Sequence, residues 1–331
     1  MTHRPQPFDH GPVRVHGTRF RHADGTPFHP WTTSLPQADD DTLRALAGSP
    51  FTKVRLLRAT LPLDRLDHQV RALGALGVQA EVVLDGRDIP ETVTRLAGHP
   101  NVWWCAPPDP EAQTDILEHD HGHHPLTVHG PPDTDFGAPW ITHASVRHPQ
   151  TRAVSGLVQD LCKPVLVDDC GAEGDDPADA EHALPGPELV SRIWEAVCRG
   201  GYAAHAESWG PRPWSAGGGR LEGTAVERVA FLRAVLEAAP SGLAHTPETY
   251  DASTLEAPGY VLQYLGPHRY PRRPFDLPSG TWRVEVLDTW NMTVRALDDA
   301  GGTGAGVSGA GVSTVVELPA EPYLAIRLRR R

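Results

Sequence analysis

The sequence is poor in the features that mark several classes of protein. Its 30 basic residues are outnumbered by 42 acidic ones, for a net charge of −12, so it lacks the basic face that a nucleic-acid partner requires. No stretch reaches the ~18–20 apolar residues of a membrane span, and the N-terminus has no signal-peptide core. We therefore expect a cytoplasmic protein with no nucleic-acid and no membrane partner.

Cysteine is scarce as well, with four residues and no CxxC spacing. This excludes a disulfide framework and a zinc-ribbon site, and buried free thiols are expected instead. The 18 histidines include the tract HDHGHH at 119–124. Its spacing is irregular and no second ligand cluster accompanies it, so we predict no metal site and no organic cofactor. Nothing in the sequence specifies an oligomeric state.

Between residues 28 and 238, short apolar runs alternate with longer runs of helical period. Such alternation is typical of βα units around a parallel sheet. The predicted strands are 28–33, 53–57, 78–84, 101–106, 126–129, 140–143, 164–168 and 202–205. Eight units in this length predict a (β/α)8 TIM barrel. An open doubly wound sheet would need a glycine-rich first turn, and none is present.

Two further segments flank the predicted barrel of residues 28–240. Residues 1–27 contain an alternating hairpin around Asp24-Gly25, which we expect to cap the barrel floor. Residues 241–331 lose the helical period and alternate as strands, which predicts a small antiparallel β-sandwich. The glycine-rich segment 301–311 is interpreted as a flexible hairpin loop within it.

The chemistry of such a barrel lies at the C-terminal ends of its strands. Carboxylates follow the fourth, seventh and eighth predicted strands, and two opposed carboxyls are what glycosidic cleavage requires. The alternative interpretation is that they cap helices or lie in solvated loops. The candidate catalytic residues are Asp109, Asp169, Glu173 and Glu207, and the candidate substrate-binding residues are Arg55, Trp104, His129, His143, His205, Trp209 and Trp214.

Several stretches carry a resemblance to a known family. They include SPFTKVRLL, HPNVWW, KPVLVDDCGAEG, GGYAAHAES and VEVLDTWNMTV, and the likeness runs from about Gly11 to Arg329. The chain resembles glycosyl hydrolases of the clan A, family-5-like barrel type that carry a C-terminal β-sandwich of unknown function. This resemblance implies the barrel fold, a small-molecule substrate such as a glycoside, and catalysis by two glutamates.

The departures from this family pattern concern the catalytic positions themselves. Asp109 stands where the family has its acid/base glutamate, Pro108 replaces the preceding asparagine, and Asp169 stands at the nucleophile position. Each Glu→Asp change withdraws a carboxyl by roughly 1.5 Å. Two such changes could widen the ~5–5.5 Å gap of a retaining enzyme to the ~6.5–9.5 Å of an inverting one.

Two catalytic hypotheses follow, with a third outside catalysis. In the first, the protein is a glycosidase with Asp109 as acid and Asp169 as nucleophile or base. In the second, it is a repurposed pseudo-glycosidase of specialised metabolism. The barrel then acts on a non-sugar or natural-product-like substrate by general acid–base chemistry of Asp169, Glu173, His143, His205 and Glu207. In the third, the protein binds a ligand without catalysis.

Overall fold

A computed structural model describes residues 10–57, 61–174, 183–209, 214–246, 253–278, 280–297, 307–309 and 313–331. Its main body is a closed barrel of parallel strands. In chain order these are β4 (Thr32–Leu35), β5 (Lys53–Leu57), β6 (Gln79–Val83), β7 (Val102–Ala106), β8 (Leu126–Gly130), β9 (Ala144–Arg147), β10 (Val165–Asp169) and β13 (Tyr202–His205). Each strand pairs with the next, and β13 pairs with β4 to close the ring. The predicted TIM barrel is confirmed.

Helices surround this ring because the outward side chains of the strands are apolar and need a cover. The helices are α1 (Asp40–Ala47), α2 (Leu63–Ala75), α3 (Ile89–Leu96), α4 (Pro110–His119), α5 (Val154–Leu161), α6 (Gly186–Cys198), α7 (Trp214–Gly217) and α8 (Ala225–Glu237), with a 3-10 turn η2 (Thr151–Ala153) before α5. Within the described ranges, none of these helices is both long and apolar enough to cross a lipid bilayer.

The sixth barrel strand lies downstream of the position that the sequence predicts. The apolar residues at 140–143 were expected to form it, but β9 begins at Ala144. Trp140 and Ile141 instead anchor the loop before β9 by packing against the main core. His143 therefore precedes the strand and does not end it, which places this residue at the opposite end of the barrel from the mouth.

A hairpin closes the N-terminal end of the barrel. It consists of β1 (Val13–His16) and β2 (Arg19–His22), and the short strand β3 (Pro27–Phe28) pairs with the other edge of β2. Phe20 of β2 is buried with its ring centroid 4.8 Å from that of Trp103 and 5.5 Å from that of Tyr202. The barrel floor is thus a layer of packed aromatic side chains at the N-terminal ends of the strands.

At that opposite end, three short strands form a small sheet over the mouth. They are β11 (Ala172–Gly174), β12 (Ala183–Leu184) and β14 (Glu207–Ser208), with β11 in the middle.

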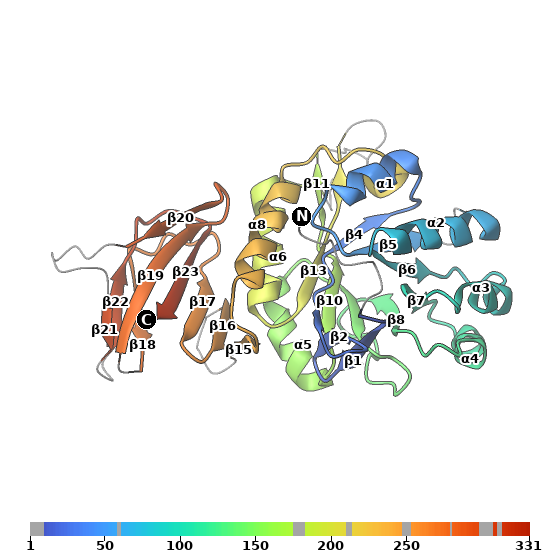
Figure 1. Ribbon diagram of the computed structural model, residues 1–331, viewed down its shortest axis with the longest axis horizontal. Helices are drawn as coiled ribbons and strands as arrows, with labels where there is room; N and C mark the ends of the chain where they lie inside the picture. Colours follow the sequence, from blue (N-terminus) through green and yellow to red (C-terminus); the bar gives the residue numbers. More distant parts are fainter. Residues whose placement is uncertain are drawn as a thin grey trace.

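The C-terminal domain is built of antiparallel strands and lies beside α6 and α8 (Figure 1). Its strands are β15 (Ala244–His245), β16 (Ser253–Ala257), β17 (Tyr260–Tyr264), β18 (Arg272–Asp276), β19 (Gly280–Asp288), β20 (Thr293–Ala296), β21 (Val307–Gly309), β22 (Ser313–Glu317) and β23 (Leu324–Arg330). Tyr264 stacks on Trp194 of α6 at 5.5 Å, which joins the two cores.

Two details differ from the expectations. Within the glycine-rich segment 301–311, Val307–Gly309 forms strand β21 against β19, while residues 301–306 and 310–311 lie outside the described residues. All four cysteines are free as expected, but Cys162 is exposed at the end of α5 and not buried.

The aromatic floor yields a stability prediction. We expect Phe20→Ala to lower the free energy of unfolding by about 3–5 kcal/mol, because it opens a cavity between Trp103 and Tyr202. Urea denaturation measures this loss. Val294→Ala, at a site that is 44% exposed, is the control and should leave the midpoint nearly unchanged. Equal stability of the two variants would show that the hairpin does not seal the barrel.

Candidate functional site

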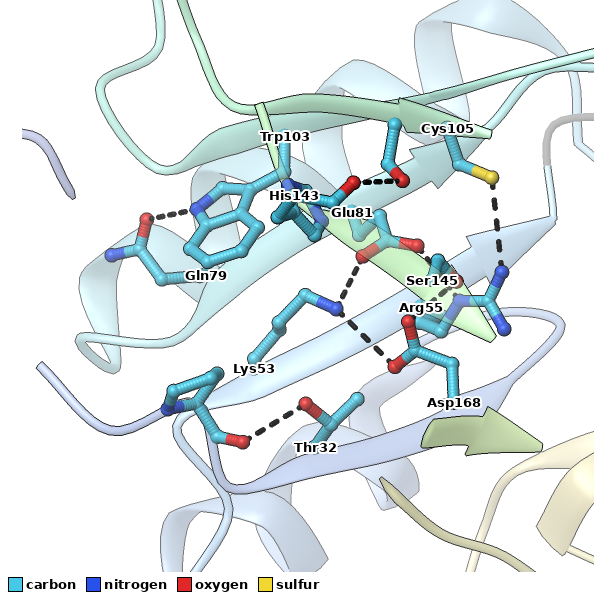
Figure 2. A network of polar contacts seen from close by, with 12 residues as sticks. Thr32, Lys53, Arg55, Gln79, Glu81, Trp103, Cys105, His143, Ser145 and Asp168 are labelled. Carbon is cyan, nitrogen blue, oxygen red and sulfur yellow. Dashed lines mark hydrogen bonds and ion pairs between the residues drawn. The ribbon is translucent and has the colours of Figure 1, made fainter. Parts of the chain in front are cut away.

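Four charged side chains meet inside the barrel, above the aromatic floor. Lys53 and Arg55 are on β5, Glu81 is on β6, and Asp168 is on β10. Lys53 is fully buried and forms an ion pair with Glu81, while its Nζ lies 3.6 Å from Asp168 Oδ1. Arg55 Nε donates to Glu81 Oε1 at 2.8 Å. Figure 2 shows Lys53 between the two carboxylates, so two cations and two anions balance in one buried cluster.

The electrostatics of this cluster favour the charged forms of Glu81 and Arg55. Burial alone would raise the pKa of Glu81, but the attraction of Lys53 and Arg55 outweighs it and holds that pKa well below its usual range. Burial likewise opposes the charge on Arg55, yet Glu81 and Asp168 raise its pKa above the ordinary value. Nearby Cys105 is held in its neutral form instead, because burial raises the pKa of its thiol to about 12. Cys105 is therefore a neutral thiol and not a nucleophile.

A pocket of about 430 Å³ opens above the charged cluster. Its walls come from the C-terminal ends of the strands, where ligands bind in this fold. Its polar lining consists of Ser34, Arg55, His129, Arg147, Asp168, Asp169 and Ser215. Arg147 Nε donates to Asp169 Oδ2 at 2.8 Å, across the adjacent strands β9 and β10. Of the predicted residues, the structure thus brings Asp169, Arg55 and His129 to one cavity.

His129 is held from below by a chain of hydrogen bonds. Ser145 Oγ donates to Asp168 Oδ2 at 2.6 Å, and His129 Nδ1 lies 3.0 Å from the same Oγ. A hydroxyl has a single hydrogen to donate, and the Ser145 hydroxyl donates it to Asp168. In the contact with Ser145, His129 Nδ1 must therefore be the donor and Ser145 Oγ the acceptor. Burial, assisted by the charge of Arg55, lowers the pKa of His129 to about 4.

Asp109 has a different role from the one that its position in the sequence suggests. It is the N-cap of α4, and its carboxylate accepts hydrogen bonds from the backbone N–H groups of Glu111 and Ala112. The residue is exposed and is not part of the pocket lining given above. The two prolines before it and Pro110 after it suit a helix start, where proline costs no hydrogen bond.

Glu173 and Glu207 bind the start of α8. Glu173 accepts from the backbone N–H groups of Thr224 and Ala225 at 2.8 and 2.7 Å. Glu207 accepts from those of Glu222 and Gly223 at 2.7 and 2.6 Å. Both glutamates are buried, and a side chain at Gly223 would collide with the carboxylates of both. Glu173 thus satisfies backbone donors at the N-terminus of α8, and Glu207 satisfies those of the two residues just before its N-cap.

This pair also bears on metal binding. Glu173, His205 and Glu207 each offer a ligand atom, and these atoms lie within 4.8 Å of one another. The carboxylate oxygens, however, face the positive end of the α8 dipole and are already bonded to its N–H groups, which disfavours a cation there. Burial raises the pKa of Glu207, which further weakens it as a ligand. We interpret the cluster as the anchor of α8.

Most of the remaining predicted residues lie in the packed interior. Trp104 is fully buried in the layer between the barrel and its helices, and His143 lies in the floor with its ring 5.3 Å from that of Trp103. Trp214 donates from Nε1 to Thr33 Oγ1 at 2.8 Å, and the same hydroxyl lies 3.1 Å from His205 Nδ1. Trp209 is half-buried. None of these five predicted side chains belongs to the pocket lining given above.

Sequence reasoning missed four residues that build the site, namely Lys53, Glu81, Ser145 and Arg147. Asp168 lies next to Asp169 at the end of the seventh predicted strand, where a carboxylate of the site was expected. A signal for part of this set was present. Lys53 and Arg55 are alternate residues of one apolar strand, so their side chains point to the same face. The next predicted strand carries a single charged residue, Glu81, of opposite sign. Arg55 and Glu81 are in fact register partners in the parallel pair β5–β6.

Comparisons with known proteins agree with this architecture. Residues 251–329 match the model of a family described as a domain of unknown function (DUF5605). No curated protein matches the chain. A crystal structure of a candidate glycoside hydrolase from Bacteroides vulgatus ATCC 8482 superimposes with a TM-score of 0.81 and 24% identity, over 98% of this chain and 83% of that one. The chain therefore has the fold of that protein.

Two more distant structures belong to enzymes that act on glucans. They are a β-glucanase of Saccharophagus degradans (14% identity, TM-score 0.49, 71% of this chain and 97% of that one) and the endoglucanase Cel5A catalytic domain of Thermobifida fusca (16%, 0.43, 64% and 90%). The expected resemblance is confirmed for the fold. At these identities, the reaction has to be argued from the site.

The buried ion cluster yields a second prediction. We expect Glu81→Gln to lower the free energy of unfolding by about 3–5 kcal/mol, since it leaves Lys53 and Arg55 buried without their shared anion. Asp41→Asn removes the partner of Arg44 in an exposed ion pair and is the control, with little change expected. Chemical denaturation of both variants measures the contrast, and similar midpoints would contradict it.

The buried histidines yield a third prediction. Burial lowers the pKa of His143 from its ordinary 6.5 to about 4 and that of His205 to about 3. As the pH falls, these two histidines therefore bind protons in the unfolded chain before they do so in the folded protein. Their contribution to the free energy of unfolding is complete above about pH 6.5, the ordinary pKa of histidine. It is lost as the pH falls toward the pKa values of the folded protein. We expect the free energy of unfolding to fall between pH 7 and 5.

Urea titrations at several pH values test this prediction. His143→Gln should flatten the dependence, whereas His268→Gln, at an exposed position, should not change it. A slope that is the same in both variants would show that His143 does not contribute.

Proposed function

We propose that the protein is an enzyme that performs general acid–base chemistry on a small hydroxylated molecule, with Asp169 as its principal pocket carboxylate. The single observation that carries this proposal is the pocket of about 430 Å³ where Asp168, Asp169, His129, Arg55 and Arg147 converge. Its volume falls within the ~300–1,000 Å³ that small-molecule sites occupy. Its walls offer both proton acceptors and cationic donors.

The placement of the carboxylates favours this chemistry over that of an ordinary glycosidase. Glycosidic cleavage calls for two carboxyls on either side of the scissile bond. Among the described residues that line the pocket, the carboxylates are Asp168 and Asp169, which are consecutive on one strand. Asp109, the expected acid, is bonded to backbone N–H groups at the start of α4. The site thus resembles the repurposed pseudo-glycosidase of the second hypothesis.

The likeness to a candidate glycoside hydrolase keeps sugars among the substrates to be tested. A first screen would therefore combine aryl glycosides with esters and lactones of hydroxylated molecules, and would follow both turnover and binding. Binding without turnover of any compound would favour a non-catalytic protein and contradict the proposal.

Two matched substitutions distinguish the hypotheses. We expect Asp169→Asn to reduce turnover by about 100-fold or more, because it removes an acid–base group from the pocket. We expect Asp109→Asn to retain turnover and stability, since asparagine is as good an N-cap as aspartate. Steady-state kinetics on the best substrate of the screen measures both. A large loss in Asp109→Asn would restore the paired-carboxylate glycosidase.

A structural control accompanies these variants. Asp109→Ala should cost about 1 kcal/mol of unfolding free energy through loss of the cap, without a change in kcat. If kcat falls with stability intact, Asp109 acts in the chemistry.

A further inference from the structure

His129 lines the pocket and is held by two residues that the sequence does not connect with it. It is at the end of β8, Ser145 is on β9, and Asp168 is on β10, so three neighbouring strands each supply one member. The parallel register makes His129 and Ser145 direct partners. The geometry is therefore set by strand pairing, which is more rigid than a loop.

The proton of each hydrogen bond in this chain can be assigned. Asp168 accepts from Ser145 at 2.6 Å, and Ser145 in turn accepts from His129 Nδ1 at 3.0 Å. Nδ1 then carries the hydrogen, and Nε2 carries the lone pair. Within the described part of the chain, no hydrogen-bond partner of Nε2 is found.

We propose that His129, fixed as the Nδ1–H tautomer by Ser145 and Asp168, is the proton acceptor of the pocket through its Nε2 atom. The group that it accepts from is a hydroxyl of the substrate or a water molecule. This inference rests on the proposed function, and it adds the residue that takes the proton.

The step balances in simple terms. The O–H bond of the hydroxyl breaks, its proton forms a new N–H bond at Nε2, and the electron pair stays on the oxygen, which takes the negative charge as the ring becomes positive. The imidazolium still donates through Nδ1 to Ser145, whose own proton points to Asp168. Through these two hydrogen bonds, the negative charge of Asp168 stabilises the protonated ring of His129. Ser145 and Asp168 are positioning residues in this scheme.

The surrounding charges keep the base available. Arg55 and Arg147 oppose protonation of the ring, whereas Asp168 and Glu81 favour it, and burial, the largest effect, lowers the pKa to about 4. His129 is then neutral across the physiological range, and its lone pair is free to accept. Activity that depends on this base should rise through about pH 4 and be level above it.

Nitrogen-15 NMR of the histidine side chains tests the inference without a substrate. In the whole wild-type protein at neutral pH, we expect the His129 signal of the Nδ1–H tautomer, identified by its absence in His129→Gln. Ser145→Ala should move it toward the Nε2–H tautomer, and Ser145→Thr, which keeps the hydroxyl, should restore it. Ser215→Ala is the matched control, because this serine lines the same pocket but is not bonded to His129. An Nε2–H tautomer in the wild type would overturn the inference.

Kinetics on the best substrate of the screen completes the test. His129→Gln should lower kcat by about 100-fold or more, Ser145→Ala by roughly 10-fold, and Ser145→Thr should recover most of that loss. Full activity of His129→Gln alongside an inactive Asp169→Asn would overturn the role of His129 and leave the proposed function standing. Substitution at Asp168 is less informative, because this residue also faces Lys53 in the buried cluster.

Discussion

The balance of charge inside the barrel is the constraint on which the rest of the structure depends. Lys53, Arg55, Glu81 and Asp168 are removed from water, and each would be costly there without its partners. Their ion pairs link β5, β6 and β10 across the interior of the barrel. The aromatic floor beneath them serves the same purpose, since the packed rings of Phe20 and Trp103 shield the cluster from water on that side.

The same cluster prepares the pocket. Arg55 and Asp168 belong to both, so the side chains that a ligand would touch are fixed by ions that it does not touch. Asp168 also orients Ser145, and through it His129. Fixing polar groups before a ligand arrives is what makes them effective, because no reorganisation is then required during the reaction.

The carboxylates that first draw attention in the sequence serve mainly to begin helices. Asp109 caps α4, while Glu173 and Glu207 bind the N-terminus of α8. A helix start and a catalytic acid demand similar chemistry, a carboxylate next to a strand end, and the two cannot be told apart without the fold. The barrel has the fold of a candidate glycoside hydrolase, while the carboxylates of its pocket, among the described residues, lie together on β10.

The sequence by itself determined the architecture. Apolar runs of strand length alternate with helical periods, and this local pattern specifies a (β/α)8 barrel with a β-rich C-terminal part, down to the bounds of β5 and β13. It misplaced β9, because Trp140 and Ile141 are as apolar as a strand although they anchor a loop. Only the tertiary structure decided which polar residues share the pocket. Arg55, His129 and Asp169 come from strands that are far apart in the chain, and the direction of each side chain follows from strand register and hydrogen-bond partners that local composition does not encode.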